Sequence, residues 1–407
     1  MRFLRWPTIF VLGGLLGVLF VQYLSVHPRK MSYYLLGSSI VLFVLGVVIK
    51  IGFHDSSLVG AILLAFGAFI IGHLLMTKII LLRDDPRPKP ELTRKPGDPG
   101  LGHTAIVYFT HGEPETYNPI GWINQFNEFD EQGIDFIPLI ARPFFFNALR
   151  NKYLEVGKSD HRKMHFQMIT SLEEAFRAEG DTTTKFYLSF LDDNPRPDAA
   201  TIQALNEGAS RIVVSEVFLT ISNHTAEGKD LIKELDIEET FGVPVEFTGP
   251  LYDSQTLKSL FIHRADANIG ETDKSKVGIL LVGHGQPDEW DIEWSTETEQ
   301  ELNFRNDVLA LLAANGYNPE NLSLAWMEFK EPKPAEKVEE FLQNGIEKLL
   351  FFSAAISADA IHSQYDIPEL VYEAKYPPGF PVINLGAWNN DPIVIQAIKE
   401  KIDPLMD

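Results

Sequence analysis

The sequence predicts an α/β fold in which two similar doubly wound half-domains with parallel sheets face a central cleft, preceded by three transmembrane helices. Three long apolar runs without internal charges lie before residue 80. After residue 103, short apolar runs alternate with amphipathic stretches, and one pattern of turns, strand and histidine occurs twice. We therefore expect an anchor (1–82), a Pro-rich tether (83–102) and two half-domains (103–250 and 251–407).

The first predicted elements are the apolar runs 8–26, 31–49 and 57–77. Each is about long enough to cross roughly 30 Å of hydrocarbon, so we expect a multi-pass protein with a lipid bilayer as partner. A cleaved signal peptide is the alternative for the first run, but two further spans follow it. Eight Lys and Arg residues lie on one side of the spans and three on the other, which favours a cytoplasmic soluble region.

The segment that follows the spans has a different composition. Residues 83–102 contain five prolines and no apolar periodicity. Such a segment favours an extended backbone and resists helix formation. We expect a semi-extended tether between the membrane and the soluble region.

The charges divide unevenly along the chain. Residues 1–95 hold 11 Lys and Arg against 4 Asp and Glu, whereas the remainder holds 24 against 52. A soluble region this acidic does not bind the phosphate backbone non-specifically, so no nucleic acid partner is expected. The absence of cysteine excludes disulfides, thiolate nucleophiles and cysteine-ligated metals. Any metal must be held by histidine, carboxylate or water.

The soluble elements alternate between strands and helices. The expected strands are 105–109, 211–219, 277–282, 322–327, 348–352 and 381–385. The expected helices include 169–178, 297–314, 335–344 and 392–401. This alternation predicts parallel sheets covered on both faces.

An internal repeat joins the same features in the same order in each half: two prolines, a helix, a glycine turn, a strand and a histidine. The offset is 137 positions at the glycines, Gly208 and Gly345, and 138 at the histidines, His224 and His362. Each copy also opens with a strand that ends in His-Gly. Two half-domains of similar structure are the expected result.

Four histidines follow predicted strands. His111 and His284 come directly after a strand, and His224 and His362 come just after a later strand of each half. Because the carboxyl ends of parallel strands form the ligand-binding edge of a sheet, all four can reach one rim. A loop or capping role is the alternative for each, and whether His111 and His224 form a second site stays open.

Several short motifs resemble the ATP-independent class II tetrapyrrole chelatases. In the second half they are Val282-Gly283-His284-Gly285-Gln286-Pro287-Asp288 and the segments 326–332 and 358–368. The spacing from His362 to Asp366-Ile367-Pro368 is similar to that of the sirohydrochlorin cobaltochelatases. In the first half, segments 109–116, 149–157 and 167–170 resemble ferrochelatases, in which the latter two line the porphyrin pocket. The resemblance covers most of residues 103–407.

The resemblance implies a chelatase-like fold and a metal–tetrapyrrole lyase activity. It implies that His284 is the metal-site histidine, and that His362 stands where ferrochelatases have a catalytic glutamate and cobaltochelatases a second histidine. It places His111 on a loop position that in some ferrochelatases is an aromatic residue near the metal. We expect His284 and His362 to be catalytic, with His111 and Glu328 as further metal ligands; a role in escorting protons or a solvated position is the alternative for Glu328.

Three other features complete the expected site. Asp366, four residues after His362, is expected to orient that ring or to cap the following helix. Phe144 and Phe145, beside Arg142, are candidates for gripping an aromatic disc that carries carboxylates. A buried apolar run at a helix start is the alternative for the two phenylalanines.

The leading hypothesis is a membrane-anchored chelatase that inserts a divalent metal, Fe²⁺ or alternatively Co²⁺, into a porphyrin in haem or tetrapyrrole biosynthesis. Neutral imidazole can both ligate such an ion and accept a proton at cytoplasmic pH, and no other cofactor is required. The alternatives are a sirohydrochlorin or cobalt chelatase, and a non-catalytic tetrapyrrole or metal carrier. The three spans also suit a membrane-protein partner or a homo-oligomer.

Overall fold

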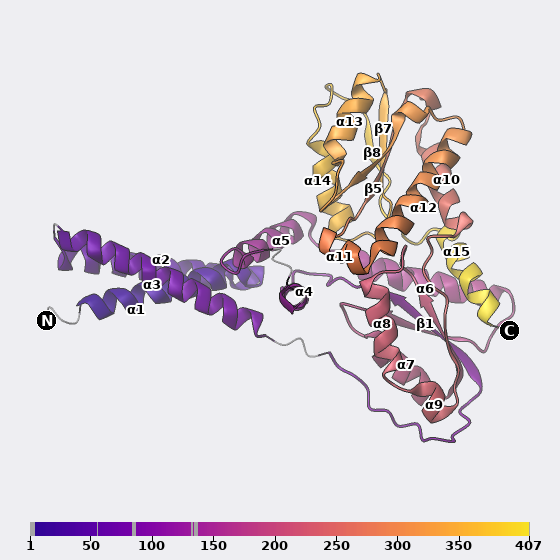
Figure 1. Ribbon diagram of the computed structural model, residues 1–407, viewed down its shortest axis with the longest axis horizontal. Coiled ribbons are helices and arrows are strands. Elements are labelled where there is room, and N and C mark those ends of the chain that lie inside the picture. The colour runs from indigo at the N-terminus through magenta and orange to yellow at the C-terminus, as the bar shows by residue number, and fades with distance from the viewer. Residues whose placement is uncertain (1–4, 55, 84–86, 132, 134–136, 407) are drawn as a thin grey trace. The chain divides into compact units, whose positions relative to one another are not determined.

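The computed structural model describes residues 5–54, 56–83, 87–131, 133 and 137–406. The chain forms two compact units (Figure 1): a helical unit of Met1–Pro86 and Thr116–Lys158, and a sheet unit of Arg87–Glu115 and Ser159–Asp407. Residues 116–158, which we expected in the first half-domain, therefore belong to the same unit as the apolar helices.

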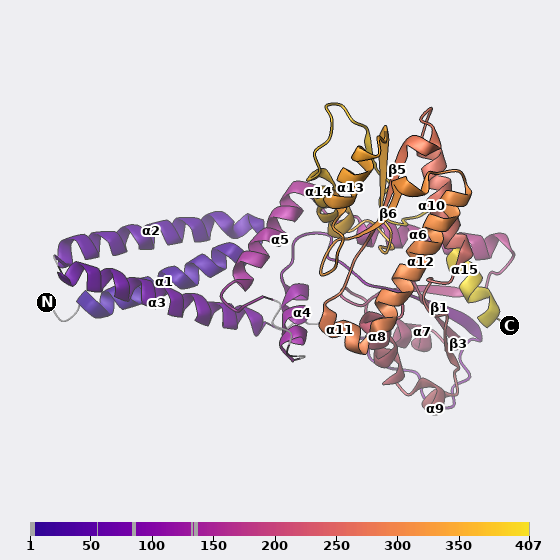
Figure 2. The same ribbon diagram turned by 45° about the horizontal axis from the view of Figure 1, so that its top comes forward.

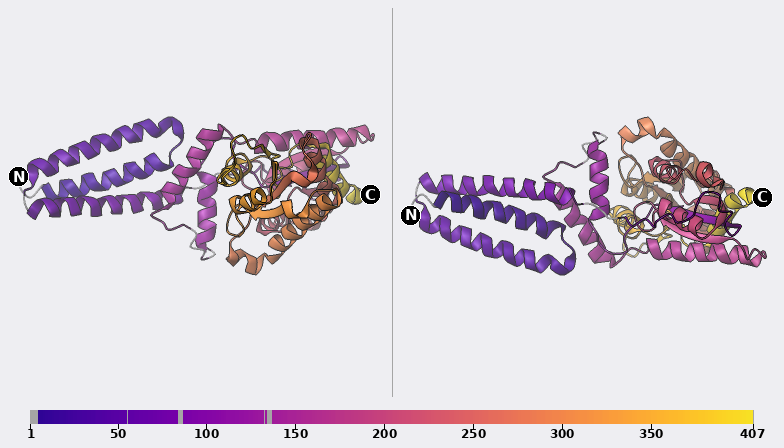
Figure 3. Two further views of the ribbon diagram at one scale, coloured as in Figure 1. Left: turned by 90° about the horizontal axis from the view of Figure 1, so that it is seen from above. Right: turned by 90° about the horizontal axis from the view of Figure 1, so that it is seen from below.

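In the described part of the helical unit, α1 (Arg5–Ser25), α2 (Pro28–Gly52) and α3 (Ser56–Leu81) run side by side (Figure 3), and α4 (Ile120–Glu131) and α5 (Arg142–Val156) follow them. By length and composition, α1, α2 and α3 are each able to cross a membrane. The three apolar runs are thus confirmed as helices of spanning length. The cytoplasmic orientation stays a prediction.

Close contacts between glycines and backbone join α1 to α3. Gly13 and Gly17 lie about one turn apart on α1, and a Cβ at Gly17 would overlap the backbone carbonyl of Phe69 on α3. A Cβ at Gly72 would overlap the carbonyl of Gly14 in the same way. In a bilayer, apolar contact between helices gains little over contact with lipid, so close backbone packing is a main source of helix association.

The segment 116–158 is attached to the C-terminal end of α1 by polar contacts. Buried Arg150 donates to the backbone carbonyls of Tyr23 (2.6 Å) and Val26 (3.1 Å). The Tyr117 hydroxyl donates to the carbonyl of Ser25 (2.8 Å). The last carbonyl groups of a helix have no backbone N–H partner within the helix. The side chains of Arg150 and Tyr117 therefore donate to carbonyl oxygens that would otherwise be left unpaired.

Among the described residues, the sheet unit contains two four-stranded parallel sheets, with strand orders β2-β1-β3-β4 and β6-β5-β7-β8. The strands are β1 (His103–Thr110), β2 (Lys185–Phe190), β3 (Ala209–Glu216), β4 (Val245–Phe247), β5 (Val277–Gly283), β6 (Leu322–Trp326), β7 (Lys348–Ser353) and β8 (Val382–Asn384). The two orders match strand for strand. This topology is the predicted α/β class with two similar halves.

Helices cover both faces of each sheet (Figure 2). The α-helices of the described part of the sheet unit are α6 (His161–Ala178), α7 (Pro197–Asn206), α8 (Asn223–Lys233), α9 (Ile237–Phe241), α10 (Gln255–Asn268), α11 (Asp288–Glu293), α12 (Ser295–Ala314), α13 (Pro334–Gln343), α14 (Ile367–Tyr372) and α15 (Pro392–Ile402). Helices α7, α8 and α9 pack on one face of the first sheet, and α13 and α14 on one face of the second.

The other faces of the two sheets share one hydrophobic core. It contains Tyr108 of β1 and Leu281 of β5, both fully buried, together with residues of α6, α10, α12 and α15. The C-terminal helix α15 supplies Val394 and Ile398, and it packs against both α6 of the first half and α10 of the second. The two halves are therefore joined by buried apolar surface rather than by a flexible linker.

The predicted tether is extended, and its described part lies against the first half. Arg94 is buried and donates to the carbonyl of Ala209. The backbone N–H of Thr93 donates to Oδ1 of Asn206 at 2.8 Å. Residues 87–102 are therefore packed as part of the sheet unit and do not form a separate linker.

The glycine contacts between α1 and α3 can be tested with a matched pair of substitutions. We expect Gly17→Val to lower the free energy of unfolding of the helical unit by about 1–3 kcal/mol, because the new side chain overlaps backbone that cannot move aside. Gly67→Val is the control, since a Cβ at Gly67 of α3 meets no atom within 4 Å. Thermal unfolding of the full chain in detergent, followed by helical circular dichroism, measures both. Equal shifts for the two variants would contradict the packing argument.

Candidate metal centre

Two histidines of the second half lie together at the carboxyl end of its sheet. His284 follows the last residue of β5, and His362 opens a π-helical turn, His362–Asp366, that leads into α14. Their ring centroids are 5.3 Å apart and their planes are inclined by 81°. Single π-helical turns are frequent at functional sites. The structure thus brings together the two residues that the sequence singled out as catalytic.

Hydrogen bonds hold both rings by the Nδ1 atom. Nδ1 of His284 lies 2.6 Å from the carbonyl oxygen of Gly285, and Nδ1 of His362 lies 2.7 Å from Oδ2 of Asp366. A ring nitrogen that faces such an oxygen carries the proton, so in each neutral ring the lone pair is on Nε2. A partner on one nitrogen orients the other nitrogen for metal binding.

Neighbouring charges give the two rings different proton affinities. Burial by itself would lower the pKa of His362, but the hydrogen bond and charge of Asp366, together with Glu328 and Glu113, raise that pKa above its ordinary value. Burial lowers the pKa of His284, and the charge of His362 lowers it further. At neutral pH, His284 is accordingly the more readily neutral ring and His362 the more readily protonated one.

Glu328 was expected to ligate a metal, and its charge acts on both His284 and His362. Within the part of the chain that the structure describes, no group of three His, Asp or Glu side chains is arranged to hold a metal ion. The centre is therefore a histidine pair with carboxylates nearby. A pair leaves several coordination positions for water or for an incoming ligand.

A buried ion pair supports the backbone of His284. Glu301 of α12 accepts a hydrogen bond from the backbone N–H of His284 and pairs with Arg305, with 3.2 Å between Oε1 and Nη2. Gly283 makes room for it, because a Cβ there would overlap the Glu301 carboxylate. This pair was not among the residues predicted from the sequence. The sequence feature that indicates the pair is the i, i+4 spacing of two opposite charges on a helix that also carries core residues.

The first half carries an equivalent pair. His111 follows β1, His224 lies in the first turn of α8, and their ring centroids are 4.7 Å apart with planes inclined by 77°. Nδ1 of His111 lies 2.9 Å from the carbonyl oxygen of Gly112 and 3.5 Å from Oδ2 of Asp192. Our expectation grouped His111 with His284, whereas the structure pairs its ring with His224.

A third histidine cluster is buried between the halves. His165 of α6 contacts the Tyr108 hydroxyl through Nδ1 (2.9 Å), and through Nε2 it contacts the hydroxyls of Thr110 (3.2 Å) and Ser357 (3.3 Å). Burial, with a smaller contribution from the charge of His111, lowers the pKa of His165 to about 3. His165 is therefore a neutral structural group that links a residue of the first half to one of the second.

The residues expected to grip a tetrapyrrole all lie in the helical unit. Arg142 is buried and forms an ion pair with Asp130, with 2.7 Å from Nη1 to Oδ2. Phe145 packs against aromatic neighbours of α4, and Phe144 is half exposed and stacks on His73. Arg142 thus already has a carboxylate partner within its own unit, which the sequence pattern did not indicate.

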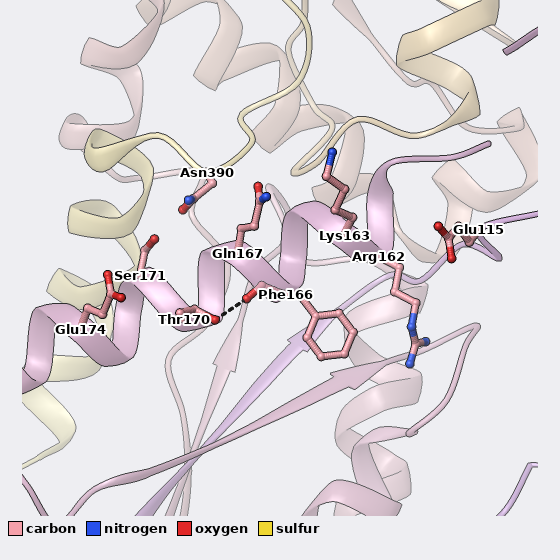
Figure 4. A pocket seen from close by; sticks show the side chains of 9 residues that line it. All are labelled: Glu115, Arg162, Lys163, Phe166, Gln167, Thr170, Ser171, Glu174 and Asn390. Carbon is pink, nitrogen blue, oxygen red and sulfur yellow. Dashed lines mark hydrogen bonds between the residues drawn. The ribbon is translucent and has the colours of Figure 1, made fainter. Parts of the chain in front are cut away.

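A groove of about 730 Å³ runs along α6. Figure 4 shows its lining residues, which are Glu115, Arg162, Lys163, Phe166, Gln167, Thr170, Ser171, Glu174 and Asn390. Gln167 and Thr170 belong to the segment that resembles part of the ferrochelatase porphyrin pocket. None of the four strand-end histidines lines this groove, so it is separate from the two histidine pairs.

No protein-family model and no curated protein matches the chain. Solved structures with a similar fold include SirB from Bacillus subtilis with Fe³⁺, at 13% identity and a TM-score of 0.47, and the sirohydrochlorin chelatase SirB from Bacillus subtilis subspecies spizizenii with cobalt, at 11% and 0.43. Each match covers 74% of this chain and 94% of the other. DR2241 from Deinococcus radiodurans, a multi-domain protein with structural similarity to chelatases, matches at 14% identity and 0.45, over 74% of this chain and 54% of its own.

The carboxylate of Asp366 is expected to strengthen metal binding by orienting His362. We expect Asp366→Asn to weaken Co²⁺ binding about 10- to 100-fold, because loss of the charge leaves Nε2 less basic and the ring less fixed. Glu373→Gln is the matched control, since Glu373 is exposed on the turn that ends α14. Titration of the full chain with Co²⁺, read from its visible absorption, gives both affinities. Unchanged affinity in Asp366→Asn would contradict the orienting role.

Buried His165 is expected to make the fold sensitive to acid. Its pKa is lowered in the folded state, so its contribution to stability is complete above the unfolded pKa of about 6.5 and is lost as pH falls from there towards about 3. Between these limits, one such histidine lowers the free energy of unfolding by about 1.4 kcal/mol for each unit by which the pH falls. His165→Gln should flatten this decline, and His263→Gln, at an exposed position on α10, should not. Urea unfolding at pH 7, 6, 5 and 4 measures the slopes, and equal slopes would exclude His165 as the titrating group.

Proposed function

We propose that this chain is a class II chelatase, an enzyme that inserts a divalent metal ion into a tetrapyrrole without ATP. The observation that carries the proposal is the His284–His362 pair, in which both Nδ1 atoms are hydrogen-bonded, so that each ring in its neutral form has its lone pair on Nε2. The pair also lies on the sequence motifs that resemble this enzyme family, and the residue four places after His362 is the carboxylate that holds it.

The arrangement suits the steps of metal insertion. A divalent ion must lose water, and two protons must leave the pyrrole nitrogens as the metal enters. A neutral imidazole is a suitable ligand for a borderline-soft ion. His284 would hold the ion through Nε2, and His362, whose protonated form the Asp366 carboxylate stabilises, would accept a pyrrole proton. Glu328 and solvent would carry protons away from the centre.

The preferred pair of substrates is Fe²⁺ and a porphyrin that carries carboxylates, in haem or tetrapyrrole biosynthesis. Three helices able to cross a membrane favour a substrate or product that partitions towards lipid, with the sheet unit on the cytoplasmic side. A histidine at position 362 favours the second candidate, Co²⁺ with sirohydrochlorin, because ferrochelatases have a glutamate at the position of His362 and cobaltochelatases a second histidine.

Phe144, Phe145 and Arg142 are the residues proposed to bind the macrocycle. Phe144 is half exposed on α5 and offers an aromatic face, whereas Phe145 is engaged with Trp122 at 4.8 Å between ring centroids. Arg142 could bind a substrate carboxylate only by giving up Asp130. Among these three residues, Phe144 is thus the best candidate for direct contact.

The proposal predicts metallation by the purified full chain in detergent. Free porphyrin or sirohydrochlorin is mixed with Fe²⁺, Co²⁺ or Zn²⁺, and the change to the metallated absorption spectrum is followed. We expect His284→Ala to abolish turnover and His362→Ala to reduce it at least 100-fold, a typical effect of losing a general base. His263→Ala, at an exposed position on α10, should retain full activity.

Two results would overturn the assignment. Full activity of His284→Ala would place the reaction elsewhere in the molecule. Absence of turnover with every metal and macrocycle, combined with tight binding of the finished metallated product, would identify the chain as a carrier.

A further inference from the structure

We propose that His111 and His224 form a second divalent-cation site in the first half, for a borderline-soft ion such as Co²⁺, Zn²⁺ or Fe²⁺. Their ring centroids are 4.7 Å apart, a little closer than the 5.3 Å between His284 and His362. The inference goes beyond the proposed reaction, because it concerns binding of the metal alone. It would stand whether or not the chain metallates a tetrapyrrole.

The backbone around the two pairs follows the same hydrogen-bond pattern. The N–H of Asp192 donates to the carbonyl of His111 (2.8 Å), and the N–H of Glu328 donates to the carbonyl of His284 (3.1 Å). One residue earlier, the N–H groups of Leu191 and Met327 donate to the carbonyls before each histidine, both at 2.9 Å. Asp192 of the first half is therefore the positional equivalent of Glu328 of the second.

The glycine after each histidine has the same role in both halves. Gly112 and Gly285 have φ angles of 107° and 84°, in the region that side chains disfavour. A Cβ at Gly112 would crowd the backbone of Asp192 and Asp193, and one at Gly285 would overlap the carbonyl of Glu328. The two His-Gly turns thus pack on equivalent neighbouring loops, which fixes the direction of each histidine.

The orientation of His111 leaves its metal-binding nitrogen available. The carbonyl of Gly112 fixes the proton on Nδ1, so in the neutral ring the lone pair is on Nε2, as in His284. The side chain of His111 is 46% exposed, which lets a hydrated ion reach the pair. The carboxylate of Asp192, 3.5 Å from Nδ1, would compensate the charge of a bound cation from behind the ring.

Contacts across the halves bring the two pairs to one rim of the sheet unit. Glu113, two residues after His111, accepts a hydrogen bond from the backbone N–H of Ile361 at 3.1 Å, and Ile361 precedes His362. Trp290, six residues after His284, lies with its ring centroid 6.5 Å from that of His224. Ions bound at both pairs would therefore be neighbours, each held by its own two histidines and completed by water.

The test counts Co²⁺ ions bound per full chain in detergent, by equilibrium dialysis and by visible absorption, with no tetrapyrrole present. Wild type should bind two ions. His111→Gln/His224→Gln should bind one, and His284→Gln/His362→Gln should bind one, with different absorption spectra. The quadruple variant should bind none above background. His263→Gln should bind two, as wild type does, because that exposed residue lies on α10 and belongs to neither pair. Glutamine keeps much of the side-chain volume, and circular dichroism confirms folding.

Three outcomes would overturn the second site. One is two ions still bound after both first-half histidines are replaced. Another is a single ion in wild type that disappears only with His284 and His362. The third is a single ion lost in either double variant, which would mean one ion shared by all four histidines. If metallation fails while two ions bind, the proposed reaction falls and the second site stands.

Discussion

The hydrophobic core shared by the two sheets is the constraint on which both histidine pairs depend. Tyr108 of β1 and Leu281 of β5 are fully buried in this core, close before the histidine that follows each strand. Because the strands cannot slide without exposing these residues, the strand ends are fixed in space. His165 is hydrogen-bonded to Thr110 of one half and to Ser357 of the other, so a polar contact also joins the two halves. The positions of the histidine pairs thus follow from the packing of the core beneath them.

The polar groups around the His284–His362 pair fix the geometry of the two histidines more than they stabilise the fold. The buried Glu301–Arg305 pair carries a desolvation cost that its attraction offsets only in part, and apolar residues of similar volume could pack there without that cost. What the pair supplies is a carboxylate held against the backbone N–H of His284. Asp366 does the same for the ring of His362. The two histidines are thereby held in different ways, His284 through its backbone and His362 through its side chain.

Features that depend on a local sequence pattern could be predicted, whereas features that depend on how distant elements pack together could not. Apolar runs of spanning length and strands buried on both faces have strong periodic signals, and His284 and His362 follow directly from their motifs. The edge strands β2 and β4 were missed, because β2 mixes polar and aromatic residues and β4 has three residues. The pairing of Arg142 with Asp130 could not be foreseen, since it depends on how α4 meets α5. Nor does composition reveal that residues 116–158 belong with the apolar helices.

Because residues 116–158 belong to the helical unit, that unit is more than an N-terminal extension of the sheet unit. The chain passes from the helical unit to the sheet unit, returns through the segment inserted between β1 and α6, and crosses once more. Deleting residues 1–86 would remove the carbonyls of Tyr23 and Val26 that accept hydrogen bonds from Arg150, and of these acceptors only Oδ1 of Asn147, within the inserted segment, would be kept. The inserted segment with α4 and α5, which begins five residues after His111, would then lose its hydrogen bonds to the end of α1. The chain therefore passes three times between the two units, so that neither unit is a terminal segment that a single cut would separate from the other.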